Sequence, residues 1–221
     1  MSLDVTPSPQ TLRSQDLFKA HHIDDFTLHV KSAILLKRVR SYVSRTMMAH
    51  RVFTRPPEGY EPLNRAVQDF LSTFPPPGQG VAISADRIVA HANLHLAMIN
   101  LHEFLVHATD ANENSYFHDC MQRGAQGLVA GVRHVTATSF DLCLLHPQTF
   151  LAWAVAISAL LAEVDACRRA EDAQGEARAA EDIGMILNAL GQAGFKSRRA
   201  KRMAELAHLA CAGQLRASDL K

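Results

Sequence analysis

Apolar residues recur along this chain at intervals of three and four, which is the spacing of amphipathic helices. The first stripe follows a candidate helix cap at Asp24 or Asp25 and ends before the Pro- and Gly-containing segment 55–59. Its apolar positions are Phe26, Val30, Ala33, Ile34, Val39 and Met47. The pattern predicts one long helix between the cap and this breaker.

Two more helices are predicted before residue 110. One has Pro62 in its first turn and ends at the Pro-rich loop 75–80. The next begins at Ser84, a good capping residue, and runs to about residue 108. Its inward positions are Ile88, Leu94, Met98, Ile99, Leu101 and Leu105.

A fourth helix is predicted over about 116–136, although it contains several glycines. Glycine inside a helix costs stability, so tight packing against a neighbouring helix is the expected reason for its presence. The alternative is that this glycine face builds oligomers with other copies of the chain. The glycines concerned are Gly124, Gly127 and Gly131.

The C-terminal third is predicted to hold a strongly apolar helix over about 148–165, a stripe over 183–190 and a last helix over 196–212. The charged stretch 166–182 is either a solvated helix or an insertion. In the last helix the inward positions are expected to be Met203, Leu206 and Leu209. No run alternates with a period of two, so the predicted fold is all-α, a globular bundle of about seven helices. We expect a flexible leader at 1–15, a helical domain at 16–212 and a tail at 213–221.

Composition narrows the class of protein. The 221 residues are 48% hydrophobic and carry a formal net charge of +1. A chain of this length suits one domain, and the charge balance argues against a dedicated nucleic-acid binder. Four well-separated cysteines show no zinc-ribbon spacing and are expected to be free thiols. We therefore expect an intracellular protein. The longest apolar run, 150–162, is shorter than a membrane span, so no membrane contact is predicted.

Histidines line one side of the predicted third helix. At roughly 100° per residue, His91, His95 and His102 fall on a common face. Three imidazoles in a row could hold a transition metal, but helix-packing histidines are the simpler interpretation. If a small ligand binds, we expect a cavity edged by His95, Met98 and His102. No metal or cofactor is predicted.

His118-Asp119 is a possible fragment of a metal-dependent phosphohydrolase site. That chemistry needs upstream histidines, for which His91 and His95 are candidates, and a further downstream acid. A two-residue motif is weak evidence in a chain with 12 histidines. No nucleophile elbow and no phosphate-cradling glycine loop is present. The sequence therefore predicts no catalytic residue, and a helical hydrolase remains an alternative.

Basic residues are dense near the C-terminus. Five of the seven residues at 196–202 are basic, which is typical of a nuclear-import signal, a phosphate-contacting patch or a solvated helix face. The five are Lys196, Arg198, Arg199, Lys201 and Arg202. The basic residues of the first helix spread around it and look like ordinary solvation; they are Lys31, Lys37, Arg38, Arg40 and Arg45.

Four blocks, taken in order, resemble the fungal-specific transcription factor domain, the middle homology region of binuclear zinc cluster regulators. They are Asp25-Phe26-Thr27-Leu28-His29-Val30-Lys31 with residues 34–39, Leu63 with Phe70-Leu71-Ser72-Thr73-Phe74-Pro75, Ala90-His91-Ala92-Asn93-Leu94-His95 with residues 99–102, and the apolar segment 147–161. The resemblance covers about residues 16–165 and, more loosely, continues to 212. It rests on order and apolar spacing, because each block alone has low specificity.

The resemblance implies a non-catalytic regulatory domain in the nucleus. Such a domain would control transcription through a small-molecule effector or through contacts with the transcriptional machinery or other regulators, with a homodimer possible. The family's six-cysteine DNA-binding module is not in this sequence, so DNA would be reached only through that absent module. We therefore expect the C-terminal part of a regulator, with no catalytic residues to carry over.

Overall fold

The computed structural model describes residues 24–49, 56–73, 84–108 and 114–213. The predicted leader at 1–15, the start of the predicted domain at 16–23, the Pro-rich loop at 75–80 and the tail from residue 214 lie outside these ranges. Within them the chain forms only helices, which confirms the all-α prediction. The helices are α1 (Asp25–Ala49), α2 (Tyr60–Thr73), α3 (Ala85–Ala108), α4 (Asn114–Thr136), the 3₁₀ turn η2 (Leu142–Leu144), α5 (Pro147–Arg169), α6 (Ala173–Gly194) and α7 (Arg198–Cys211).

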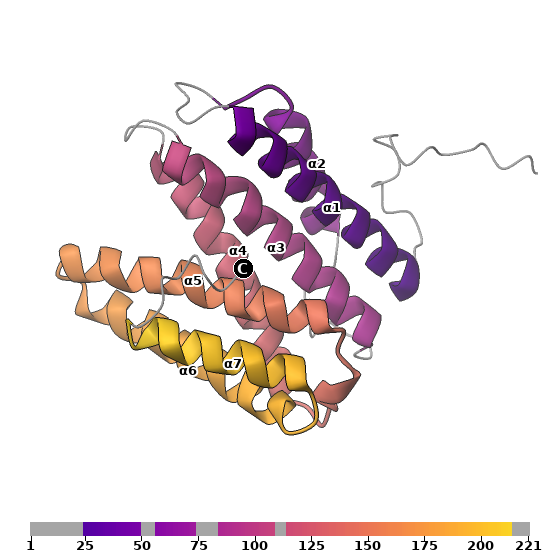
Figure 1. The fold of residues 1–221 in the computed structure, drawn as a ribbon, viewed down its shortest axis with the longest axis vertical. Helices are drawn as coiled ribbons and strands as arrows, with labels where there is room; N and C mark the ends of the chain where they lie inside the picture. Colours follow the sequence, from indigo (N-terminus) through magenta and orange to yellow (C-terminus); the bar gives the residue numbers. More distant parts are fainter. Residues whose placement is uncertain (1–23, 50–55, 74–83, 109–113, 214–221) are drawn as a thin grey trace, which may run out of the picture.

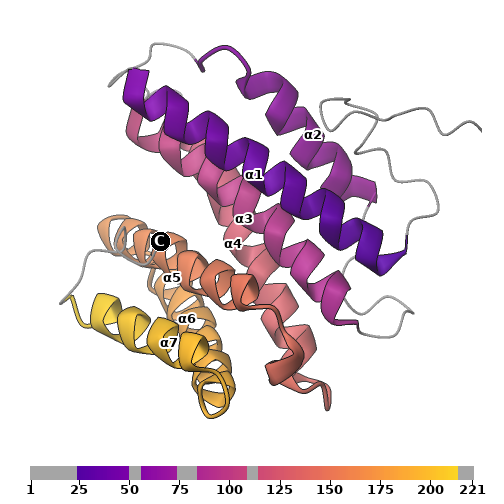
Figure 2. The same ribbon diagram turned by 45° about the vertical axis from the view of Figure 1, so that its right-hand side comes forward.

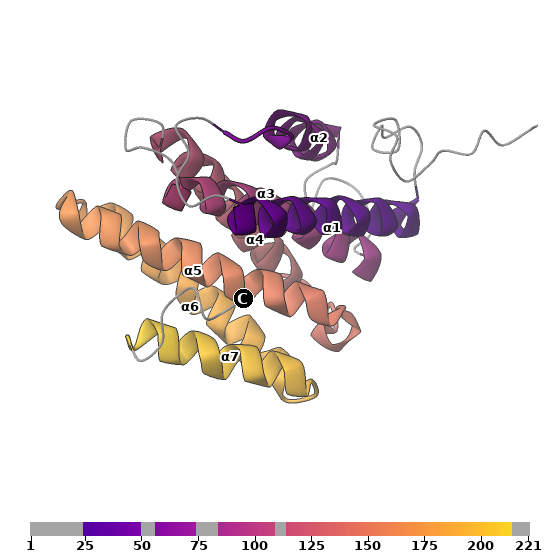
Figure 3. The ribbon, with the colours of Figure 1, turned by 45° about the horizontal axis from the view of Figure 1, so that its top comes forward.

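The helices form two groups. Helices α1 to α4 make one group, and α5, α6 and α7 make a second group packed against it (Figure 1; Figure 3). The two groups meet where α5 contacts α3 and α4 and where α6 contacts α4. Figure 2 shows α5 lying between the N-terminal helices and the α6–α7 hairpin.

The predicted caps form as expected. The backbone N–H of Thr27 donates to Oδ1 of Asp24 at 2.7 Å, so Asp24 caps α1. The N–H of Arg87 donates to Oγ of Ser84 at 3.1 Å at the start of α3. The two caps are tied together, since Arg87 also holds the carboxylate of Asp25 at 2.7 Å.

Helix α3 is the centre of the fold. It contacts α1, α2, α4 and α5, and its side chains are buried on nearly every face. A helix surrounded in this way needs no separate polar face, which explains why its polar residues are not gathered on one side. All six inward positions predicted for it are buried.

Two of the three glycines in α4 allow a close approach to α3. A Cβ on Gly124 would lie 2.8 Å from Ile99, and one on Gly127 would lie 2.1 Å from the ring of His95. Tight packing within the chain is therefore confirmed at these two positions. The alternative, a glycine face for oligomers, is wrong for Gly124 and Gly127, because α3 already covers them. A Cβ on Gly131 would meet nothing within 4 Å.

The charged stretch 166–182 is neither one continuous solvated helix nor an insertion. It contains the end of α5, a tight turn and the start of α6. Glu171 takes a left-handed backbone conformation with φ of 56° in that turn. Asp172 then caps α6 by accepting from the N–H of Gly175 at 2.9 Å. The charge marks a solvent-exposed helical corner.

The inward face of α7 differs from the prediction. Leu209 is 37% exposed, while Met203 and Leu206 are only partly buried. The buried positions are the small residues Ala200, Ala204, Ala207 and Ala210. Helices α6 and α7 approach so closely that the backbone of Lys201 would lie within 3.3 Å of a Cβ on Gly194. Small side chains therefore take the inner face, and the leucines move toward its edge.

The four cysteines are free, as predicted, and Cys143 and Cys167 are half-buried. Of the described helices, α5 alone has the length and composition of a membrane span, and 61% of that apolar stretch is buried inside the molecule.

Candidate functional site

The histidine row of α3 splits into two environments. The rings of His91 and His95 stack with centroids 6.0 Å apart and planes 17° from parallel. The ring of His95 fills the space that Gly127 leaves on α4. Burial lowers the pKa of His95 to about 4, so the imidazole is neutral at physiological pH.

His102 packs elsewhere, against α2 and the start of α4. Its Nδ1–H donates to the carbonyl of Met98 at 2.7 Å. Its ring packs against that of Tyr60 with the centroids 5.9 Å apart and the planes nearly perpendicular. Burial lowers the pKa of His102 to about 4. The three residues predicted to edge a cavity, His95, Met98 and His102, all pack within the core, and none of them lines the pockets described below.

The ligand set proposed for a metal-dependent hydrolase is not assembled. No three His, Cys, Asp or Glu side chains are placed to hold a metal ion within the described ranges. His118 is half-buried and Asp119 is exposed. His118 instead influences Glu163 on α5. Burial raises the pKa of Glu163, and the nearby His118 opposes that rise.

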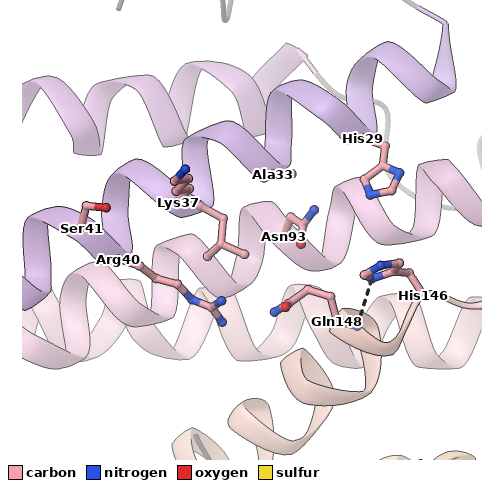
Figure 4. Close-up of a pocket in the computed structure, with 9 residues that line it drawn as sticks. His29, Ala33, Lys37, Arg40, Ser41, Asn93, His146 and Gln148 are labelled. Carbon is pink, nitrogen blue, oxygen red and sulfur yellow. Dashed lines mark hydrogen bonds between the residues drawn. The ribbon is translucent and has the colours of Figure 1, made fainter. Parts of the chain in front are cut away.

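A pocket opens where α1, α3 and the first turn of α5 meet (Figure 4). Its volume is about 290 Å³, at the lower end of the range for small-molecule sites. We call it the junction pocket; its lining side chains are His29, Ala33, Leu36, Lys37, Arg40, Ser41, Asn93, His146 and Gln148. The junction pocket therefore lies where the two groups of helices meet.

Two histidines form one end of the junction pocket. The ring of His29 lies 6.0 Å from that of His146, with the planes at 62°. The Nδ1–H of His29 donates to Oδ1 of Asp86 at 2.8 Å, which fixes the ring on α1. His146 caps α5 by accepting from the N–H of Gln148 at 3.2 Å. Both rings are thus positioned by local contacts and can offer their other nitrogen to a ligand.

Asn93 forms the inner wall of the junction pocket. It is 2% exposed, and its Nδ2 donates to Oγ of Ser32 at 3.2 Å. Its Oδ1 is buried and has no hydrogen-bond partner among the described residues, and the same holds for Nε2 of Gln148. A buried polar atom without a partner costs about 1–3 kcal/mol, so both atoms favour occupation of the pocket by a polar group.

The lining is positively charged. Lys37 and Arg40 line the pocket, and no carboxylate does. Within the described ranges neither cation forms an ion pair with Asp or Glu. Figure 4 shows the guanidinium of Arg40 and the side chain of Gln148 extending toward each other below Asn93. The interpretation of these two basic residues as ordinary solvation overlooked their position beside a pocket.

The sequence contained one signal for this pocket. Asn93 lies between the apolar residues Ala92 and Leu94 in the middle of α3, and a buried amide there needs a polar neighbour. The histidines gave no such signal, because His29 and His146 are far apart in sequence. Only the packing of α1 against α3 and α5 brings them together.

The predicted basic patch lies on the α6–α7 corner. Lys196 pairs with Asp141 at 3.6 Å, and Arg202 pairs with Glu205 at 3.6 Å. Phe195, which precedes the patch, is 91% exposed. The patch side chains Lys196, Arg198, Arg199, Lys201 and Arg202 are all exposed. Lys196, Arg198 and Lys201, with Phe195, border a shallow groove of about 640 Å³.

Comparisons with known proteins add no relative. No protein-family model, no curated protein and no solved structure matches the chain.

Proposed function

We propose that this chain is a non-catalytic regulatory domain of a fungal transcription factor, which binds a small effector in the junction pocket and passes its state to protein partners. One observation carries the proposal. The pocket lies between the two helical groups and presents the buried, unpartnered Oδ1 of Asn93. The strongly shifted histidines, His95 and His102, pack in the core rather than in this pocket, which favours binding over catalysis.

The position of the pocket suggests how an effector acts. Asn93 belongs to α3, while His146 and Gln148 belong to the first turn of α5. A ligand that bonds to both sides stabilises the arrangement in which the two groups are close. Because a ligand shifts an equilibrium by its differential affinity for two states, such a ligand would favour that arrangement over a more open one.

The surface that would meet partners is the α6–α7 corner. Its exposed cations and Phe195 offer charge and an apolar anchor to an acidic protein segment. The resemblance to the fungal regulatory domain supports a nuclear role and contacts with the transcriptional machinery. The same basic patch is the candidate nuclear-import signal.

The proposal is tested in fungal cells with the full chain tethered to a reporter promoter through a heterologous DNA-binding module. Gln148→Met removes the amide from the pocket with little change in size, and we expect reporter output to change several-fold. Gln192→Met, on an exposed turn of α6, is the matched control and should leave the output unchanged. Equal output from all three proteins, or exclusion of the full-length protein from the nucleus, would contradict the proposal.

A further inference from the structure

We propose that the ligand of the junction pocket is a small organic dianion that also carries a hydroxyl group, such as a hydroxydicarboxylate. The inference rests on the proposed function only in that both use the same pocket. It assigns a chemical class to the occupant from the charges and hydrogen-bonding atoms that line the pocket.

Charge is the first argument. Lys37 and Arg40 lie one turn apart on α1, and among the described residues neither is neutralised by a carboxylate. Asp86, which contacts the lining residue His29, is engaged by that histidine. The amino-terminal end of α5 also faces the pocket through His146 and Gln148, and a helix amino terminus favours negative charge. Two positive side chains without acid partners match a ligand with two negative charges.

The position of the hydroxyl follows from the hydrogen bonds of Asn93. The hydroxyl of Ser32 donates to the carbonyl of His29 at 2.7 Å, so its oxygen is left to accept a bond. It accepts from Asn93 at 3.2 Å, which orients the amide with Nδ2 toward Ser32. The remaining atom, Oδ1, can only accept. The ligand must therefore offer a donor at this wall, and a carboxylate alone has none.

Gln148 and Arg40 set the opposite requirement. The unpartnered Nε2 of Gln148 is a donor, and so is the guanidinium of Arg40. The buried Nε2 of Gln148 needs an acceptor, and a carboxylate supplies one there and a second for the exposed guanidinium of Arg40. A ligand that satisfies the pocket therefore has a hydrogen-bond donor beside Asn93 and acceptors beside Arg40 and Gln148. At about 290 Å³ it is too small for a peptide or a nucleic acid and suits a compact molecule.

The charge requirement is tested by isothermal titration calorimetry with malate, succinate and glycerol. Malate has two carboxylates and a hydroxyl, succinate lacks the hydroxyl, and glycerol lacks the charge. We expect malate to bind and glycerol not to bind. Arg40→Gln should weaken malate binding at least about fivefold, because a charge-assisted hydrogen bond is lost. Arg65→Gln, which removes an exposed charge from α2, is the matched control and should have no effect.

The hydroxyl requirement is tested by comparing malate with succinate. Malate should bind several-fold more tightly, and Asn93→Leu should remove that difference. Because Asn93 is buried, this variant can lose stability. A second measurement therefore uses the unaltered chain: nuclear magnetic resonance should show malate, but not succinate, shifting the side-chain amide signals of Asn93.

Three outcomes overturn the inference: glycerol binding as well as malate, equal weakening by Arg40→Gln and Arg65→Gln, or no response of Asn93 to malate. The failure of the proposed function has a different signature. If malate binds as expected while the reporter ignores Gln148→Met, the ligand class stands and the regulatory role does not. If the reporter responds while only neutral compounds bind, the regulatory role stands and the ligand class is wrong.

Discussion

The α1–α4 group and the α6–α7 hairpin bury different kinds of side chain. The α1–α4 group packs large apolar residues around polar ones, and its buried polar residues are Ser32, Asn64, His91, Asn93 and His102. In the α6–α7 hairpin the buried apolar residues are mostly alanines, beside Ile183, Ile186 and Leu190 of α6; the alanines are Ala179, Ala189, Ala193, Ala200, Ala204, Ala207 and Ala210. Its one buried charge, Asp182, is paired with Arg133 of α4. Within the described residues, every buried side-chain polar atom of the hairpin has a hydrogen-bond partner, whereas several such atoms of α3 have none.

This difference separates a scaffold from a candidate site. Small side chains allow two backbones to come close and leave no polar atom without a partner. Helix α3 instead carries His95, His102 and Asn93, each of which has a buried side-chain atom without a hydrogen-bond partner among the described residues. Buried polar groups that lack partners are unexpected in a core selected for stability alone. We therefore expect perturbations of α3 to have larger and more pH-dependent effects than perturbations of the hairpin.

Acid should distinguish the two groups most strongly. His95 and His102 have pKa values of about 4 in the folded chain, against an ordinary value near 6.5. Between these values the unfolded chain binds more protons, so stability is complete above pH 6.5 and falls as the pH is lowered toward 4. Each histidine costs about 3 kcal/mol once the pH is below that window.

Urea unfolding at several pH values between 7.5 and 4 measures this loss. His102→Phe should reduce the slope, whereas His208→Gln, on the exposed side of α7, should leave it unchanged. A stability that stays constant between pH 7 and 4.5 would show that the α3 histidines are not buried in their neutral form.

Gly127→Ala should be the most damaging of the small substitutions. The added methyl group overlaps the ring of His95, and overpacking of this kind costs about 2 kcal/mol. Gly131→Ala in the same helix meets no atom and should slightly stabilise it. Thermal unfolding provides the comparison. A double variant, Gly127→Ala with His95→Ala, should recover part of the loss; equal effects at 127 and 131 would argue against the close crossing.

Ala207→Leu tests the alanine face of α7. Ala207 is fully buried, so a leucine there overfills the hairpin and should cost about 1–2 kcal/mol. Leu209→Ala should cost less, below about 0.5 kcal/mol, because Leu209 is at the exposed edge. Denaturant midpoints of the two variants rank the positions. The reverse ranking would restore the leucine face predicted from the sequence.

The smallest expected effect is a gain. Gly184 is exposed in the middle of α6 and has open space at the Cβ position. Gly184→Ala should therefore add about 0.5–1 kcal/mol through helix propensity alone. A rise in melting temperature checks this, and a loss would reveal a contact that α6 makes in solution.

Much of the secondary structure could be predicted from the sequence, for reasons that are local. Asp24 and Ser84 each cap a helix through a bond to a backbone N–H three residues later. The burial of six large apolar residues of α3 was also predicted correctly, although most of its other residues are buried too. The face of α7 was not, because hydrophobicity ranks leucine above alanine while the short distance between α6 and α7 admits only alanine.

The candidate site shows the same limit. The histidine row on α3 was visible in the sequence, but the structure gives two of its members packing roles against Gly127 and Tyr60. The junction pocket was not visible, because its walls come from three helices separated by long stretches of chain. In the sequence, Lys37 and Arg40 resemble any other solvated cations. Only the tertiary structure shows that the start of α5 lies beside them.

The sequence by itself determined that this chain is helical and which residues of α3 are apolar enough to be buried. It also determined where most of the described helices begin and end to within a few residues, but it missed the start of α6 at Ala173. These properties depend on bonds between residues three or four positions apart. Only the tertiary structure decided which helix faces touch, that His29, Asn93 and His146 share one pocket, and that the proposed metal ligands stay apart. Those outcomes depend on how closely helices approach and at what angle they cross, and side-chain size at a few crossing points sets both.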